Sequence, residues 1–106
     1  MKGTVTLIVP CYNEEESLPI FYHAVCNVAQ TLPDYQMTFL LINDGSKDNT
    51  LQIMRDLAAK DERVKYLSFS RNFGKEAAMY AGFCNAEGDY VAVMDADMQD
   101  PPSLLP

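Results

Sequence analysis

Two aspartates, Asp95 and Asp97, are separated by one residue and directly follow an apolar segment at residues 90–94. Two carboxylates held close together repel each other unless a cation or a proton lies between them. Mg²⁺ and Mn²⁺ prefer oxygen ligands, and Mg²⁺ is commonly bound by one or two carboxylates together with phosphate oxygens. The pair therefore predicts a divalent metal site that holds a nucleotide diphosphate, although a solvated acidic loop has the same composition.

Two further segments carry side chains of the kind that bind nucleotides. In residues 10–14 (Pro-Cys-Tyr-Asn-Glu), the ring of Tyr12 can stack on a base. In residues 43–46 (Asn-Asp-Gly-Ser), the carboxylate of Asp44 can accept an N–H from the edge of a base. Each segment by itself is also typical of a turn that leads into a helix. Their occurrence in order, at successive strand ends, favours a nucleotide site.

The segments that must position these residues alternate between strand and helix. Apolar runs rich in β-branched residues predict strands at residues 4–9, 37–42, 64–69 and 90–94. Apolar residues at helical spacing predict helices at residues 17–31, 49–60 and 74–86. This order predicts an α/β fold, with four strands in a parallel sheet and three helices on its two faces. Ligands of such sheets bind beyond the carboxyl ends of the strands, which is where the polar segments fall.

Composition and charge narrow the class of protein. The 106 residues are 48% hydrophobic and 22% charged, which predicts one globular domain over residues 1–106. A net charge of −7 with scattered basic residues argues against a nucleic-acid partner. The three cysteines show no paired spacing, so we expect reduced thiols. No signal peptide and no apolar run of about 18 residues is evident, so we expect a water-soluble, cytoplasmic chain.

These motifs together resemble the N-terminal half of family 2 glycosyltransferases. The similar segments cover essentially the whole chain: residues 9–15 (VPCYNEE), 43–50 (NDGSKDNT), 70–78 (SRNFGKEAA), 88–90 (GDY) and 94–102 (MDADMQDPP). Within the family, the chain is most similar to the branch of dolichyl-phosphate mannose synthase and the bacterial polyprenyl-phosphate glucosyltransferases. The resemblance implies the Rossmann-like, nucleotide-sugar-binding half of a GT-A fold, as a fragment of a longer transferase.

The resemblance also implies roles for residues around the base and ribose of the donor. Tyr12 would stack on the base, and Pro10 would belong to the same nucleotide-sugar site. Glu14 and Asp44 would hold the base or the ribose. Asn43 departs from the family, in which many members have Asp, and the amide removes one charge. For that reason the base contact is assigned to Asp44.

Further roles concern the diphosphate and the metal. The resemblance implies that Asp95 and Asp97 are the catalytic pair at the ribose, the diphosphate and a Mg²⁺ or Mn²⁺ ion. Gln99 would be a further ligand of the metal or the phosphate. Arg71 or Lys75 would neutralise phosphate charge.

The implied reaction transfers a sugar from a UDP-glucose-like or GDP-mannose-like donor to polyprenyl phosphate, with inversion at the anomeric carbon. Metal and cationic side chains would stabilise the leaving diphosphate. A phosphate acceptor is already an anion near neutral pH, so it needs little help from a general base. We expect the full-length protein to attach to the cytoplasmic face of the membrane. The isolated chain should lack activity because its acceptor half is missing, and its exposed apolar surface should favour self-association.

Three alternatives remain open at the level of the sequence. The first is the same donor site with a polysaccharide or glycoconjugate acceptor. The second is a non-catalytic nucleotide-binding module, for which the loop after the first strand would be expected to read GxGxxG, whereas it reads PCYNEE. The third is a folded fragment with a structural role alone.

Overall fold

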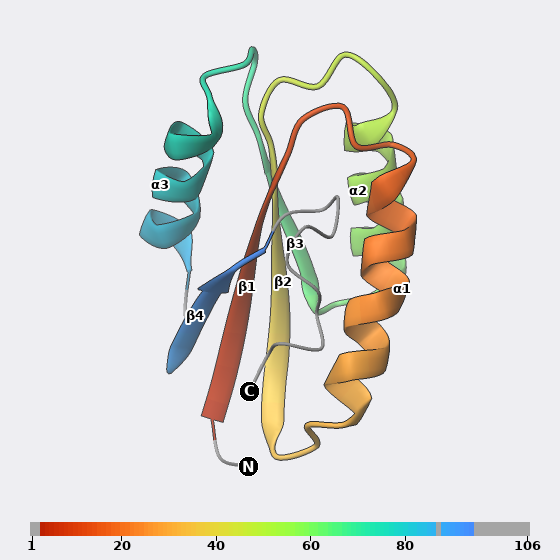
Figure 1. Cartoon of the computed structure of the whole chain (residues 1–106), viewed down its shortest axis with the longest axis vertical. Coiled ribbons are helices and arrows are strands. Elements are labelled where there is room, and N and C mark those ends of the chain that lie inside the picture. The colour runs from red at the N-terminus through yellow and green to blue at the C-terminus, as the bar shows by residue number, and fades with distance from the viewer. Residues whose placement is uncertain (1–2, 87, 95–106) are drawn as a thin grey trace.

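A computed structural model describes residues 3–86 and 88–94 of the chain. They form a parallel sheet in the order β3-β2-β1-β4, with helices on both faces (Figure 1). The strands are β1 (Gly3–Cys11), β2 (Tyr35–Asn43), β3 (Val64–Ser68) and β4 (Tyr90–Val93), and the helices are α1 (Ser17–Gln30), α2 (Thr50–Lys60) and α3 (Lys75–Asn85). The α/β fold expected from the sequence is confirmed. None of the helices in these residues is long and apolar enough to cross a membrane.

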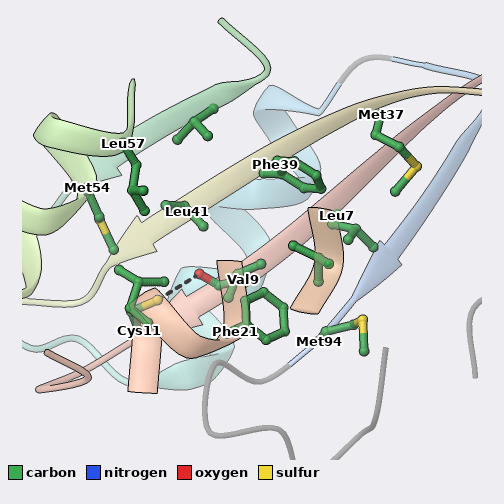
Figure 2. Close-up of a cluster of buried hydrophobic side chains, with 13 residues drawn as sticks. Leu7, Val9, Cys11, Phe21, Met37, Phe39, Leu41, Met54, Leu57 and Met94 are labelled. Carbon is green, nitrogen blue, oxygen red and sulfur yellow. Dashed lines mark hydrogen bonds between the residues drawn. The ribbon is translucent and has the colours of Figure 1, made fainter. Parts of the chain in front are cut away.

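The two faces of the sheet are covered unequally. Helices α1 and α2 lie on one face, whereas α3 lies on the other (Figure 1). Successive side chains of a strand point to opposite faces, so the nearly continuous apolar strands supply a core to each side. Figure 2 shows the larger core, under the helix pair, with side chains from β1, β2, α1 and α2. It includes Leu7, Val9, Cys11, Leu18, Phe21, Val25, Met37, Phe39, Leu41, Met54, Leu57, Val64 and Met94.

The smaller core lies between the sheet and α3. It contains Ile8, Leu40, Ile42 and Ala78. A Cβ atom at Gly82 would lie 2.4 Å from Cγ2 of Ile8, so α3 approaches β1 as closely as a glycine permits. The small residues Ala78 and Gly82, both buried, therefore form the contact of α3 with the sheet.

The end of β1 differs from the sequence-based expectation. The apolar run was expected to end before Pro10, but β1 continues through Pro10 to Cys11. Proline weakens a strand because its nitrogen cannot donate to the ladder. Ile8 turns its carbonyl toward β4, where it accepts the N–H of Met94 at 3.0 Å. Pro10 has the same orientation but lies beyond the last residue pair of β1 and β4, so its missing N–H removes no bond between the described strands.

Candidate functional site

The carboxyl ends of β1, β2 and β3 border a cavity of about 500 Å³. The loops that follow these strands lie together at the top of Figure 1. Tyr12 lines the cavity from the β1–α1 loop, Ser46 and Lys47 from the β2–α2 loop, and Arg71 and Asn72 from the β3–α3 loop. The structure thus brings two cationic side chains together with the aromatic ring of Tyr12, a residue that is 41% exposed. An aromatic ring and cations are the groups that stack on a base and bind phosphate.

Asn13 joins the β1–α1 loop to the β2–α2 loop through two hydrogen bonds, one of its backbone and one of its side chain. The N–H of Asn13 donates to Oγ of Ser46 at 2.9 Å, and its Oδ1 accepts the N–H of Lys47 at 2.8 Å. Asn13 has a φ of 52°, a left-handed conformation that asparagine adopts more easily than most residues. These reciprocal bonds set the course of the chain directly after Tyr12.

The start of α1 is held by the side chains of Asp48, in the loop before α2, and Thr50, the first residue of α2. Glu14 N–H donates to Oγ1 of Thr50 at 2.8 Å, and Glu15 N–H donates to Oδ2 of Asp48 at 3.3 Å. The Thr50 hydroxyl and N–H both donate to Oδ1 of Asp48. Burial raises the pKa of Asp48, but the hydrogen bonds from Thr50 and from the Glu15 N–H outweigh it and hold the pKa below its usual value.

Asp44 anchors the loop that follows β3. Its side chain is 4% exposed, and its carboxylate accepts the N–H of Phe73 at 2.8 Å and the N–H of Gly74 at 3.0 Å. Nδ2 of Asn72 donates to the same carboxylate at 3.3 Å and to the backbone carbonyl of Asp44 at 3.1 Å. The role expected from the sequence, a contact with the base, remains a prediction, whereas the anchoring of the loop is visible only in the structure.

Gly45 permits the close approach of the same two loops. Its φ is 71°, and a Cβ atom there would lie 2.2 Å from the backbone carbon of Arg71 and 2.2 Å from the nitrogen of Asn72. The guanidinium of Arg71 lies 4.7 Å from the centre of the Phe73 ring, within the range of a cation–π contact. A glycine at position 45 therefore allows the loop that carries Arg71 to reach the cavity.

Asn43 joins β2 to β3 beneath the cavity. The residue is 2% exposed, and its Nδ2 donates to Oγ of Ser68 at 3.1 Å while its Oδ1 accepts the N–H of Ser46 at 3.0 Å. An amide supplies a donor and an acceptor without a charge, so it satisfies both partners in this buried place.

Comparison with known proteins places the chain in a family. The family model described as "Glycosyl transferase family 2" matches residues 6–106. The chain belongs to glycosyl transferase family 2.

Individual members of the family match almost the whole chain. A bactoprenol glucosyl transferase of Shigella phage SfV is 48% identical over 102 residues, which cover 96% of this chain and 33% of that protein. An undecaprenyl-phosphate 4-deoxy-4-formamido-L-arabinose transferase of Pseudomonas fluorescens is 40% identical over 103 residues, which cover 96% of this chain and 30% of the relative. The chain therefore spans about a third of the length of these curated relatives.

The solved structures include a mannosyltransferase, PcManGT from Pyrobaculum calidifontis, in complex with GDP-Man and Mn²⁺. It matches with a TM-score of 0.72 and 25% sequence identity over 92% of this chain and 28% of that chain. The expected Rossmann-like half of a GT-A fold is confirmed by this match and by the sheet order.

The residues that the family resemblance singled out fall into three groups. Tyr12 and Arg71 line the cavity. The second group is not part of the cavity lining in the described chain and comprises Pro10 near the end of β1, Glu14 in the β1–α1 loop, Asp44 directly after β2 and Lys75 at the first residue of α3. The remaining group, Asp95, Asp97 and Gln99, lies outside the described residues.

The described residues offer no metal site of their own. Among residues 3–86 and 88–94, no group of three His, Cys, Asp or Glu side chains could hold a metal ion. Two carboxylates of the β2–α2 loop, Asp44 and Asp48, accept hydrogen bonds from N–H and O–H groups instead. The predicted metal site thus depends on Asp95 and Asp97.

Sequence reasoning missed three residues of this region. Lys47 lines the cavity, and Asp48 and Thr50 hold the start of α1. A signal for the last two was available, since Asp and Thr side chains around the start of a helix commonly form hydrogen bonds with neighbouring backbone groups. The partner of those bonds, a loop more than 30 residues away, was not predictable from that signal.

Proposed function

We propose that this chain binds the nucleotide-diphosphate sugar of an inverting glycosyltransferase whose acceptor is polyprenyl phosphate. The observation that carries the proposal is the cavity at the carboxyl edge of the sheet, where Tyr12, Lys47 and Arg71 meet. Parallel α/β sheets bind ligands at this edge. The printed names of the two relatives support a lipid-linked acceptor, and the complex of PcManGT supports a nucleotide-sugar donor.

In this proposal the donor is recognised from two sides of the cavity. The exposed ring of Tyr12 stacks on the base, and Pro10 and Glu14 belong to the same segment. Asp44 accepts an N–H from the base through an oxygen lone pair that is not used by its hydrogen bonds to the β3–α3 loop. Arg71 faces the diphosphate. Although the chain carries a net charge of −7, the cationic side chains at this edge provide a local attraction for phosphate.

Lys47 strengthens the phosphate side of the proposal. Within the part of the chain that the structure describes, neither Lys47 nor Arg71 forms an ion pair with another described residue. Their charges are therefore not already neutralised by a described carboxylate. Lys75, at the start of α3, is the second phosphate contact that the family resemblance suggests.

The proposed metal is Mg²⁺ or Mn²⁺, held by Asp95, Asp97 and Gln99. When bound, the ion would offset the negative charge that develops on the leaving diphosphate. Arg71 would add a fixed positive charge on the same group. Asp95 and Asp97 are accordingly the residues that we assign to catalysis.

The acceptor phosphate would form the new bond to the anomeric carbon as the bond from that carbon to the diphosphate breaks. Attack from the side opposite the diphosphate gives inversion, and an anionic oxygen needs no base to remove a proton. We assign acceptor binding and attachment to the cytoplasmic face of the membrane to the complete protein. The 106-residue chain by itself is proposed to bind the donor without turnover, and to self-associate.

Calorimetric titration of the purified chain with UDP, GDP and NAD, each with and without Mn²⁺, tests the proposal. We expect binding of UDP or GDP that depends on Mn²⁺, and none of NAD. Asp97→Ala should abolish the metal-dependent binding while leaving the circular dichroism spectrum unchanged. Asp56→Ala is the matched control, because Asp56 lies on the exposed face of α2 and bonds only to Gln52. Unchanged binding in Asp97→Ala would contradict the metal assignment, and a folded chain that binds none of the nucleotides would contradict donor binding by this chain.

A further inference from the structure

A short relay of hydrogen bonds runs from Asp48 through Thr50 to the segment that follows Tyr12. Thr50 is completely buried, and its hydroxyl has a single hydrogen, which it donates to Oδ1 of Asp48. Because that hydrogen is committed to Asp48, the lone pairs of Oγ1 are turned to other partners. One of them accepts the N–H of Glu14 at 2.8 Å. The carboxylate of Asp48 thereby orients the Thr50 hydroxyl so that its oxygen accepts the N–H of Glu14.

The same carboxylate makes a second contact with the segment. Oδ2 of Asp48 accepts the N–H of Glu15, while its Oδ1 accepts the N–H of Thr50 and so remains fixed to the start of α2. The backbone then turns into α1, where Leu18 N–H donates to the carbonyl of Glu14 at 2.8 Å. No side chain of α1 caps its own first turn. The orientation in which the chain enters α1 therefore depends on Asp48, in the β2–α2 loop, and on Thr50, the first residue of α2.

The residues held by this relay adjoin Tyr12. Glu14 is two residues from Tyr12, and the intervening Asn13 is itself bonded to Ser46 and Lys47. The backbone on the C-terminal side of Tyr12 is thus fixed at three successive residues, each by a partner in residues 46–50. An aromatic ring stacks on a base only if the ring is presented in the correct plane, so the backbone next to Tyr12 affects that contact.

We propose that Asp48 and Thr50 are positioning residues that set the Tyr12 ring against the cavity. They act through Glu14 and Glu15 and do not themselves touch the nucleotide. The inference rests on the proposed function in one respect, the identity of the ligand that Tyr12 meets. The placement of the ring itself can be tested without a ligand.

Thr50→Val is the principal variant, because valine has nearly the shape of threonine but offers no acceptor to Glu14. Thr50→Ser keeps the hydroxyl and should restore the unaltered behaviour. Tyr22→Phe is the matched control, since it removes a hydrogen bond of 2.6 Å to Asp61 from the same helix α1, away from the cavity. Asp48→Asn supplies a second perturbation if Thr50→Val fails to fold, because its amide cannot accept at both Thr50 and Glu15.

Three measurements on the chain decide the matter. In Thr50→Val, we expect amide hydrogen exchange of Glu14 to accelerate by about tenfold or more, because a half-buried N–H has lost its acceptor on Thr50. The nuclear magnetic resonance signals of the Tyr12 ring should shift, and the affinity for UDP or GDP with Mn²⁺ should fall by about tenfold. Thr50→Ser should reverse all three changes, and Tyr22→Phe should cause none of them.

The outcomes separate this inference from the proposed function. Unchanged Tyr12 ring signals in a folded Thr50→Val or Asp48→Asn variant would overturn the positioning role, whatever the nucleotide result. Unchanged exchange of Glu14 would overturn it as well. If the unaltered chain binds neither nucleotide while the ring signals respond to Thr50→Val, the positioning role stands and donor binding by this chain fails.

Discussion

Two networks built on buried or half-buried aspartates hold loops at opposite ends of the parallel strands, and they use different donors. Before β3, Asp61 accepts the Tyr22 hydroxyl at 2.6 Å and pairs with Nη2 of Arg63 at 2.8 Å. After β2, Asp44 and Asp48 accept mainly backbone N–H groups of neighbouring loops. The first network neutralises a carboxylate with a cation, whereas in the second no described cation pairs with Asp44 or Asp48.

Among the described residues, this difference affects which cationic side chains are paired with a carboxylate at each end of the sheet. At the amino end of β3, the Arg63 guanidinium forms a salt bridge with Asp61 and also lies 5.3 Å from the centre of the Phe39 ring. At the carboxyl edge, backbone donors satisfy Asp44, and Lys47 and Arg71 remain on the cavity wall. Backbone N–H groups stabilise a buried carboxylate as well as a salt bridge does, and they leave cations for a ligand.

The largest expected effect comes from the glycine that lets the two cavity loops meet. Gly45→Ala should lower the free energy of unfolding by about 3 kcal/mol, because it combines a strained φ with a clash against the backbone of Arg71 and Asn72. Nucleotide binding should be lost with it. Gly74→Ala is the control, since Gly74 also has a positive φ but nothing lies within 4 Å of its added Cβ. Urea denaturation of both variants measures the difference, and equal losses would show that strain alone matters.

Replacing one aspartate from each network tests most directly whether the two ends of the sheet differ in their importance for nucleotide binding. Asp44→Ala leaves the N–H groups of Phe73 and Gly74 without their acceptor and should lower the free energy of unfolding by about 2 kcal/mol. The same variant should also bind the nucleotide more weakly. Asp61→Ala should cost a similar amount of stability and leave nucleotide affinity unchanged. Denaturation and calorimetry on the two variants provide the test. A loss of affinity in Asp61→Ala would remove the distinction between the two ends of the sheet.

The Tyr22–Asp61 bond should also make stability depend on pH. Burial and the hydrogen bond to Asp61 raise the pKa of Tyr22, while the bonds from Arg63 hold the pKa of Asp61 well below its usual range. The Tyr22 contribution is therefore complete below about pH 10, the usual tyrosine pKa, and is lost as pH rises toward the raised value. The Asp61 contribution is complete above about pH 4 and is lost as pH falls toward the lowered value.

Tyr22→Phe should lower stability by about 1.5 kcal/mol at neutral pH and abolish the alkaline part of this dependence. The free energy of unfolding, measured across the pH range for the unaltered chain and the variant, checks both statements. Nucleotide affinity at neutral pH should stay the same. An alkaline loss of stability that persists in Tyr22→Phe would assign it to another tyrosine.

The smallest effect is expected at Asn43, which is buried at the carboxyl end of β2. Asn43→Asp keeps an acceptor for Ser46, and the Ser68 hydroxyl can reverse to become the donor. A carboxylate buried beside Asp44 should nevertheless cost up to about 1 kcal/mol once it ionises, so the loss should grow as pH rises above about 4. Thermal unfolding at several pH values measures it, and a loss independent of pH would point to altered packing instead.

Local patterns in the sequence were sufficient for the elements of the fold. The expected strands and helices agree with the observed ones to within two residues at each end, because apolar periods of two and 3.6 residues are properties of short segments. The extension of β1 through Pro10 was not expected, since it depends on where β4 stops pairing.

The sequence by itself thus determined the α/β class, the parallel direction of the strands and the edge at which polar loops gather. Only the tertiary structure decided the sheet order, the unequal covering of the two faces, and which residues bond across the loops. Asp44 reaches Phe73, and Thr50 reaches Glu14, over about 30 residues of chain. Hydrogen bonds over such separations depend on how helices and strands pack together, which the spacing of residues within one segment does not encode.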